Sequence, residues 1–179
     1  EQNWEIRTPR LLLRAAISRD VDDLHEIFRE SETMRYWSTK PHPDREMTEG
    51  WVQRMIDSSY NGVLDFVIVE IVAKRTANSP GKVLGKVGSW DGIEVGFIMN
   101  RDWWGRGLAY EALTTVLDHI RALLDRAHKI DINQLKADVD PRNARSLKLL
   151  TKLGFKEVGR AEKTFETEEG WADSTYLEL

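Results

Sequence analysis

The sequence predicts an α/β protein with a mixed sheet that carries helices on both faces. Short β-rich runs at 65–74, 83–90 and 93–99 precede a stretch from Ala109 to Leu124 whose apolar residues recur at helical spacing. A further candidate strand at 134–139, a second amphipathic helix and two closing β-rich runs follow. Strands on both sides of a strand–helix–strand unit give a mixed sheet with helices on both faces.

One domain over 1–179 is expected, because a chain of 179 residues buries a substantial core and no repeat or low-complexity linker divides it. Hydrophobic residues make up 41% and charged residues 31%, which is typical of a globular protein and not of a disordered one. No apolar run approaches the roughly 20 residues that span a bilayer. The first residues do not form a signal peptide either, so we expect a cytoplasmic protein with no membrane partner.

The residue types that are scarce exclude several kinds of site. The chain has no cysteine, which rules out a disulfide framework, a thiolate zinc site and a cysteine nucleophile. The four histidines show no metal-ligand spacing, so no metal is expected. A net charge of −4 argues against a nucleic-acid partner. Basic residues still concentrate over 121–160 and acidic ones over 161–179. This division fits solvated faces, or a basic region beside a phosphorylated cofactor and an acidic one beside a cationic amine.

The first part of the chain is expected to contain one strand and two helices. A continuous leucine run predicts a strand over 10–15 that is buried on both faces. Asp20 is the expected N-cap of a helix whose apolar face lies within 21–28. A loop with two prolines follows, and Asp44 is the expected cap of a second helix over 45–59.

Three antiparallel strands are expected before the central helix. The turn signal Asn78–Gly81 makes a hairpin of the runs 65–74 and 83–90. A short turn at Asp91–Gly92 then leads into the strand over 93–99.

The last part of the chain begins with a helix and closes with two strands. Asn143 lies at the start of this helix, and Gly154 fits the residue just past its end. The closing strands are expected over 155–160 and 175–179, separated by an acidic turn around Glu168–Gly170.

Gly105 and Gly107 lie between the strand that ends at Met99 and the central helix. The first N–H groups of a helix have no partner inside it, and the helix dipole makes this end partly positive. Glycine also lets an anion approach the main chain, so the loop is a candidate pyrophosphate cradle. A turn that binds no ligand would also explain these two glycines. The two common phosphate-loop motifs are absent, and Tyr110 takes the place of a third glycine.

Two motifs make the chain similar to a known family. The run Trp104-Gly-Arg-Gly-Leu-Ala-Tyr-Glu-Ala112 resembles the acyl-CoA-binding motif of the GNAT N-acetyltransferases, in the form of the RimJ/RimL-like branch that acetylates protein N-termini. Downstream, Asn143-Ala-Arg-Ser-Leu-Lys-Leu-Leu-Thr-Lys-Leu-Gly-Phe155 resembles the second signature of the family, and Thr8–Arg14 is similar to its first strand. The resemblance implies a GNAT fold: six or seven mostly antiparallel strands in a mixed sheet splayed in the middle, with about four helices on both faces.

The resemblance implies acetyl-CoA as cosubstrate, bound in the splay. Its pyrophosphate is expected on backbone N–H groups over 106–110, and its pantetheine arm beside the strand at Phe97 and Met99. The Arg106 side chain either reaches a phosphate or faces solvent. The expected cofactor-binding residues are Phe97, Ile98, Met99, Gly105, Arg106, Gly107, Leu108, Ala109, Tyr110 and Asn143.

The implied reaction is direct attack of a neutral amine on the thioester. Glu94 is the candidate base, or else an exposed strand carboxylate, and a backbone N–H at or near Ile98 is the candidate donor to the oxyanion. Many GNAT enzymes have a tyrosine where this chain has Leu150, so Ser146 is the candidate donor to the leaving thiolate. Asn143 and Ser146 also suit capping of a helix start.

The acceptor is left open by the sequence. A protein or peptide N-terminus is the first expectation, because its α-amine has a pKa of about 7.7–8.0 and is neutral more often than a lysine of about 10.4. A polyamine, an amino acid or an antibiotic is the alternative, and Tyr36 and Trp37 are candidate acceptor contacts or ordinary core. A non-catalytic acyl-CoA-binding module and a site for another nucleotide are the other hypotheses. The protein is expected to be a monomer or a homodimer.

Overall fold

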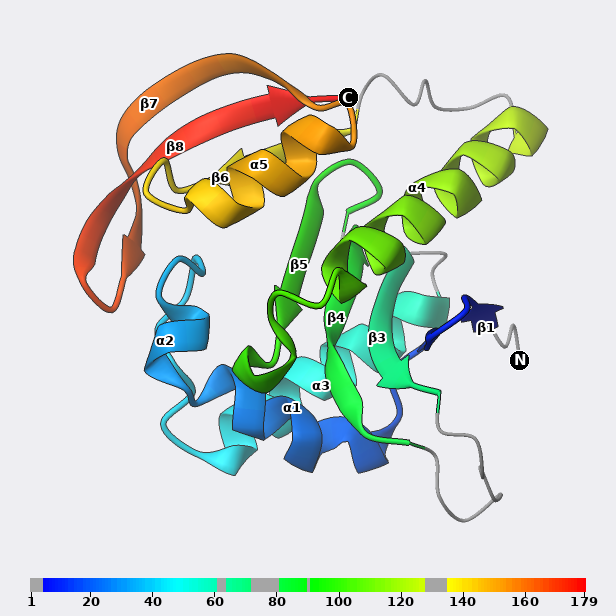
Figure 1. Cartoon of the computed structure of the whole chain (residues 1–179). Helices are drawn as coiled ribbons and strands as arrows, with labels where there is room; N and C mark the ends of the chain where they lie inside the picture. Colours follow the sequence, from blue (N-terminus) through cyan, green and yellow to red (C-terminus); the bar gives the residue numbers. More distant parts are fainter. Residues whose placement is uncertain (1–4, 61–63, 72–80, 90, 128–134) are drawn as a thin grey trace.

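The computed structural model describes residues 5–60, 64–71, 81–89, 91–127 and 135–179. These residues form two antiparallel sheets and the helices that cover them (Figure 1). The strands are β1 (Glu5–Arg7), β2 (Leu11–Arg14), β3 (Leu64–Glu70), β4 (Val83–Ser89), β5 (Val95–Met99), β6 (Lys136–Val139), β7 (Lys156–Thr167) and β8 (Gly170–Glu178). The helices are α1 (Val21–Phe28), α2 (Ser31–Met34), α3 (Arg45–Tyr60), α4 (Leu108–Ala127) and α5 (Ala144–Lys152), with 3-10 turns η1 (Ser18–Asp20) and η2 (Arg101–Trp103).

The two sheets meet at one point and then separate. The larger sheet has the order β1-β2-β3-β4-β5 and the smaller one β6-β8-β7, and every pair within them is antiparallel. Between β5 and β6 the described residues form a single parallel bridge, Glu94 to Lys136, where the Lys136 N–H donates to the Ile93 carbonyl at 3.0 Å. The expectation of a mixed, mostly antiparallel sheet splayed in the middle is confirmed.

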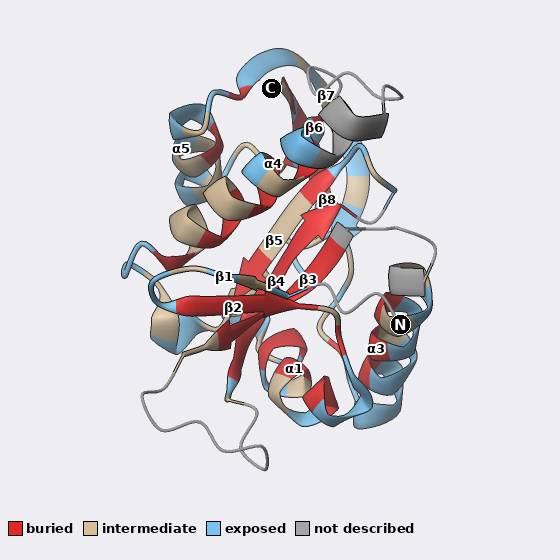
Figure 2. Cartoon of the chain, turned by 90° about the vertical axis from the view of Figure 1, so that its right-hand side faces the viewer, coloured by how far each residue is buried: buried red, intermediate tan, exposed pale blue. Residues whose placement is uncertain are grey.

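The larger sheet is buried on both faces, as the leucine run of β2 indicates. Leu11 and Leu13 pack in the cluster that includes α4, whereas Leu12 packs with α1 and α3 on the opposite face. Figure 2 shows the buried strands between these two layers of helices. Burying a leucine side chain contributes on the order of 1.5–3 kcal/mol, so this alternation holds both layers to the sheet.

Within the described residues, no helix combines the length and the apolar character needed to cross a membrane.

Several elements differ from the sequence-based expectations. The strand β1 and the short helix α2 were not expected, and β1 brings the strands in the described residues to one more than the upper expectation of seven. The closing strands β7 and β8 are longer than expected and run to the turn at Glu168. The exposed side chains of β7 are mostly charged, so its sequence is poor in the apolar residues that indicate a strand. Two register shifts also interrupt the pairing of β7 with β8. Positions 78–80 of the expected hairpin turn and Trp90 lie outside the described residues.

One expected helix cap is confirmed and one is wrong. The Asp44 carboxylate accepts a hydrogen bond from the Met47 N–H at 2.8 Å and caps α3. The Asp20 side chain makes no cap bond to α1. Instead its two oxygens each accept a hydrogen bond from Arg14 at 2.7 Å, and one also accepts from the Ile17 N–H at 2.9 Å. The reason is burial: the Arg14 guanidinium is buried and needs an anionic partner.

This buried pair gives a test of the fold. The side chains of Arg14 and Asp20 are only 8% and 4% exposed, so Asp20→Ala leaves a buried charge without its partner. We expect a loss of about 3 kcal/mol in the free energy of unfolding, measured by urea denaturation. The matched control is Asp22→Ala, which breaks an exposed pair with Arg45 and should cost less than about 1 kcal/mol. Equal losses for the two variants would contradict the assignment.

Candidate active site

A cleft of about 870 Å³ opens where β5 and β6 separate. One wall is the end of β5 with the glycine loop and the start of α4, and the other wall is α5 with the segment around α2. The described residues that line it are Glu32, Thr33, Tyr36, Trp37, Phe97, Ile98, Met99, Trp103, Trp104, Gly105, Gly107, Leu108, Ala109, Tyr110, Arg142, Asn143, Ala144, Arg145, Ser146, Lys148 and Leu149. Most of the expected cofactor residues and both expected acceptor residues therefore lie together.

The backbone of β5 presents an open edge to this cleft. Successive residues of a strand direct their N–H and C=O groups to opposite sides. The Asn100 N–H donates to the Leu84 carbonyl on β4 and the Ile93 carbonyl accepts from β6, so the odd-numbered residues of β5 face the cleft. Phe97 and Met99 thus direct their backbone groups into the cleft, as expected for the pantetheine arm.

The same alternation corrects one expectation. Ile98 lies opposite Lys86 in the β4–β5 register, and its N–H is directed to β4 and not to the cleft. The nearest main-chain donors on the cleft side are the N–H groups of Phe97 and Met99. The Met99 carbonyl is already occupied, because it accepts a hydrogen bond from the Trp104 indole at 2.8 Å.

The glycine loop connects β5 to α4 through two left-handed residues. Gly105 has a φ of 73° and Gly107 a φ of 74°, a region that other residues rarely adopt. A Cβ at Gly105 would meet no atom within 4 Å, so the backbone conformation, and not crowding, favours glycine there. At this end of α4 the Glu111 N–H donates to the Gly107 carbonyl at 3.1 Å. The N–H groups before it are those that a helix leaves without an internal partner, and they lie beside the cleft.

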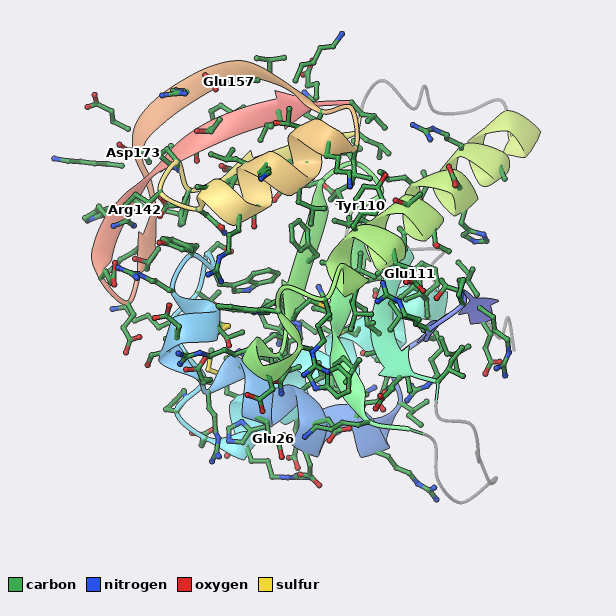
Figure 3. All side chains as sticks on the ribbon, viewed as in Figure 1. Glu26, Tyr110, Glu111, Arg142, Glu157 and Asp173 are labelled. Carbon is green, nitrogen blue, oxygen red and sulfur yellow. The ribbon has the colours of Figure 1, made fainter. Side chains whose placement is uncertain are left out.

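A basic face of α5 lies opposite the glycine loop. Arg145, Lys148 and Lys152 recur at helical spacing, and the first two line the cleft. The Arg145 guanidinium is 5.3 Å from the centre of the Trp104 ring, and the Lys152 ammonium is 4.1 Å from the centre of the Tyr110 ring. Figure 3 shows Tyr110 on the first turn of α4, on the side that faces α5. Among the described residues of the cleft, Glu32 is the only carboxylate, so the cleft is electropositive.

Sequence reasoning did not single out these α5 cations. It located the basic segment 121–160 and gave a place beside a phosphorylated cofactor as one of two alternatives, but it named no individual cation. The spacing of three and then four residues between the cations was the signal that placed them on one side of the helix.

The other end of the cleft is held by ion pairs between distant segments. Tyr36 and Trp37 follow α2 and line the cleft. The Glu169 carboxylate in the β7–β8 turn pairs with Arg35 at 3.0 Å and with Arg142 at 3.6 Å. Arg142, labelled in Figure 3, also lies 5.9 Å from the centre of the Tyr36 ring. These contacts join three separate parts of the chain, so no local pattern in the sequence reveals them.

Asn143 and Ser146 lie at the start of α5 and both line the cleft. The Asn143 side-chain oxygen accepts a hydrogen bond from the Ser146 N–H at 3.1 Å, so Asn143 is the N-cap of this helix. Its contact with a cofactor, and the role of Ser146 as a proton donor, stay predictions.

The Arg106 side chain is exposed and does not line the cleft. Its guanidinium donates to the Asp102 carbonyl at 2.8 Å and stacks on the Trp103 ring at 4.6 Å. This position fits the solvent-facing alternative.

Glu94 lies at the bridge between the sheets and not in the cleft. It lines a separate pocket of about 420 Å³ with Asp138 and Tyr176. Burial raises the pKa of the Glu94 carboxyl, and the nearby charges of Asp138 and Asp91 raise it further. A carboxyl with a raised pKa suits proton transfer, but its role as a base stays a prediction. In the part of the chain that the structure describes, no group of three or more acidic or histidine side chains is placed to hold a metal ion.

Comparisons with known proteins agree with this geometry. A family model described as an acetyltransferase (GNAT) domain matches residues 10–156. The chain is 29% identical over 184 residues to the ribosomal protein uS5-alanine N-acetyltransferase of Escherichia coli, and the alignment covers 97% of this chain and 89% of that one.

Two solved structures share the fold. One is the ribosomal-protein-S5-alanine acetyltransferase of Vibrio fischeri, with a TM-score of 0.73 and 22% identity over 99% of this chain and 96% of that chain. The other is the spermidine N-acetyltransferase of Vibrio cholerae in complex with CoA and spermine, with a TM-score of 0.74 and 19% identity over 96% of both chains.

Proposed function

Because the chain belongs to the GNAT family and is an acetyl-CoA-dependent N-acetyltransferase, we propose that its acceptor is the α-amine of a protein or peptide N-terminus. The acceptor proposal is carried by the relative named for an alanine of a ribosomal protein. The placement of the cofactor is carried by the cleft between β5 and β6, in which an open strand edge, a glycine loop at a helix start and a basic helix face converge. An extended amide chain that ends in phosphates is complementary to all three features.

The cofactor is proposed to lie along the wall formed by β5 and α4. The N–H groups at the start of α4 would hold the pyrophosphate, and the helix dipole adds about 0.3–1 kcal/mol. Arg145 and Lys148 on the facing helix supply positive charge to the same phosphates. The pantetheine amides would pair with the cleft-facing backbone of Phe97 and Met99.

The reaction is proposed as a direct transfer. The amine nitrogen attacks the thioester carbonyl carbon, the carbon–sulfur bond breaks, and the amide forms as the amine loses its proton to solvent or to a base. The N–H of Phe97 or Met99 would stabilise the oxyanion. The sulfur leaves as a thiolate, and Ser146 at the start of α5 is the proposed donor to it. Holding both reactants in one cleft supplies much of the rate acceleration.

The relatives support an N-terminal acceptor and suggest one alternative. The Escherichia coli relative is named for an alanine of a ribosomal protein, and an α-amine needs little help to become neutral. A small cationic amine is the second candidate, because Glu32 lies in the cleft beside Tyr36 and the spermidine enzyme shares the fold.

The acceptor is tested by release of free CoA from acetyl-CoA on a panel of peptides with different N-terminal residues, polyamines and amino acids. Turnover on peptides but not on polyamines is the expected result. Turnover on polyamines alone would replace the proposal with its alternative. If CoA binds and no amine on the panel reacts, the acceptor proposal is wrong.

The cradle is tested by placing a carboxylate in the loop. Gly105→Asp should weaken CoA binding, measured by calorimetry, by at least about tenfold, because Gly105 lines the cleft with open space around its Cβ position and the new side chain adds negative charge to the proposed phosphate-binding loop. The matched control is Gly92→Asp, since Gly92 has a φ of 84° and lies outside the cleft. Both variants strain the backbone alike, so equal CoA affinities in the two would remove the loop from the site.

Ser146→Ala tests the proposed donor to the thiolate. The variant should lower kcat by about tenfold to a hundredfold and leave CoA affinity within about twofold of the unsubstituted enzyme. Stopped assays give kcat, and calorimetry gives the affinity. A parallel loss of both would make Ser146 a binding residue and leave the thiolate to be protonated by water.

A further inference from the structure

The glycine loop is held from outside the cleft by a side chain of the first strand segment. Arg10 precedes β2, and one guanidinium nitrogen donates to the Arg106 carbonyl at 2.9 Å. The same guanidinium donates through Nε to the Glu111 carboxylate at 2.6 Å. Arg10 does not line the cleft, whereas Gly107, the next residue after Arg106, does. The loop therefore lies between the Arg10 side chain and the cleft.

Glu111 anchors this arginine to the first turn of α4. One carboxylate oxygen accepts hydrogen bonds from the Thr8 hydroxyl at 2.5 Å and from the Arg10 N–H at 3.0 Å, and the other accepts from Arg10 Nε. Burial acts to raise the pKa of the Glu111 carboxyl, but the hydrogen bonds from Thr8 and Arg10 hold it below its usual value. Glu111 is consequently ionised near neutral pH and fixes the guanidinium with charge-assisted bonds.

The direction of one carbonyl determines the direction of the following N–H. The described peptide bonds are all trans, so the Arg106 C=O and the Gly107 N–H point in opposite directions within one peptide plane. Because the carbonyl is bound to Arg10, the Gly107 N–H is directed away from Arg10, toward the side on which the cleft lies.

This peptide plane needs an external restraint. It lies next to Gly107 and one residue after Gly105, and glycine allows a peptide plane to rotate at low cost. A rotated plane would present the Arg106 carbonyl, which repels a phosphate, in place of a donor. If the peptide plane has a single orientation before the ligand binds, no binding free energy is lost in ordering it.

We infer that Arg10 and Glu111 are positioning residues, which orient the Gly107 N–H toward the pyrophosphate of the acyl donor. The inference rests on the proposed placement of the cofactor. An arginine suits this role because its planar fork serves two partners at once, the Glu111 carboxylate and the Arg106 carbonyl. A lysine keeps the charge but cannot reproduce both bonds in one geometry.

The decisive variant is therefore Arg10→Lys. It preserves the positive charge near the loop but removes the guanidinium that bonds both the Glu111 carboxylate and the Arg106 carbonyl. A loss of CoA affinity therefore reports the orientation of the loop and not the charge. We expect the Kd for CoA, measured by calorimetry, and the KM for acetyl-CoA each to rise about tenfold, with kcat within about twofold. The kinetic parameters for S-acetylpantetheine, which lacks the pyrophosphate, should be unchanged.

Three further variants complete the experiment. Arg160→Gln removes an exposed arginine that pairs with Glu157 on β7 and should leave all of these values unchanged. Glu111→Gln frees the guanidinium and should reproduce part of the loss seen for Arg10→Lys. Because both act through one carbonyl, the double variant should lose no more affinity than Arg10→Lys alone.

The outcomes distinguish failure of this inference from failure of the proposed cofactor placement. A Kd for CoA within about twofold of the unsubstituted enzyme in Arg10→Lys overturns the inference, and so does an equal loss with S-acetylpantetheine or a fall confined to kcat. A protein without substitutions that neither binds CoA nor uses acetyl-CoA overturns the proposed cofactor placement itself, before any variant is measured.

Discussion

The separation of β5 and β6 is the constraint on which the rest of the site depends. A strand edge carries N–H and C=O groups that need partners, and β4 satisfies only one side of β5. After the bridge at Glu94 the described residues offer no second strand to the other side. The backbone of Phe97 and the N–H of Met99 are thus left facing a cleft. An extended ligand with its own amides can complete the sheet there, and this explains why the cofactor is proposed to lie in this gap.

The gap is kept open by contacts at its two ends. At the α4 end the Trp104 indole binds the Met99 carbonyl, and Arg10 with Glu111 holds the loop from behind. At the α2 end Glu169 joins the β7–β8 turn to two arginines from other segments. Hydrogen bonds to the main chain, which fix geometry closely, therefore hold the wall along the proposed cofactor path. Exposed ion pairs, which stabilise little and leave the shape adaptable, hold the wall near Tyr36 and Trp37, where the acceptor is proposed to bind.

Charged side chains are also distributed unevenly between the two ends of the cleft. The cations of α5 lie along the proposed phosphate path, so the excess of basic residues over 121–160 is partly gathered on one helix face. Glu111 lies on the first turn of α4 but is paired with Arg10, and Glu32 lies on the α2 side of the cleft. Other acidic residues lie in the β7–β8 turn and in the pocket that contains Glu94 and Asp138. Like charges kept apart from the phosphates avoid repulsion of a polyanionic ligand, and a cationic amine would meet the acidic side.

Local patterns in the sequence determined most of the elements and the loop at the centre of the site. The leucine run of β2, the Asp44 cap and the glycine pair before α4 follow from burial, capping and left-handed backbone geometry, each of which acts within a few residues. Only the tertiary structure decided which backbone groups of β5 face the cleft, because that depends on its register with β4. It also decided that Asp20 pairs with Arg14 in place of capping a helix, that Glu94 lies outside the cleft, and that Arg10 restrains the glycine loop. These features arise from pairing and packing between segments distant in sequence, where the partner of a polar group is selected by burial and proximity in the folded chain.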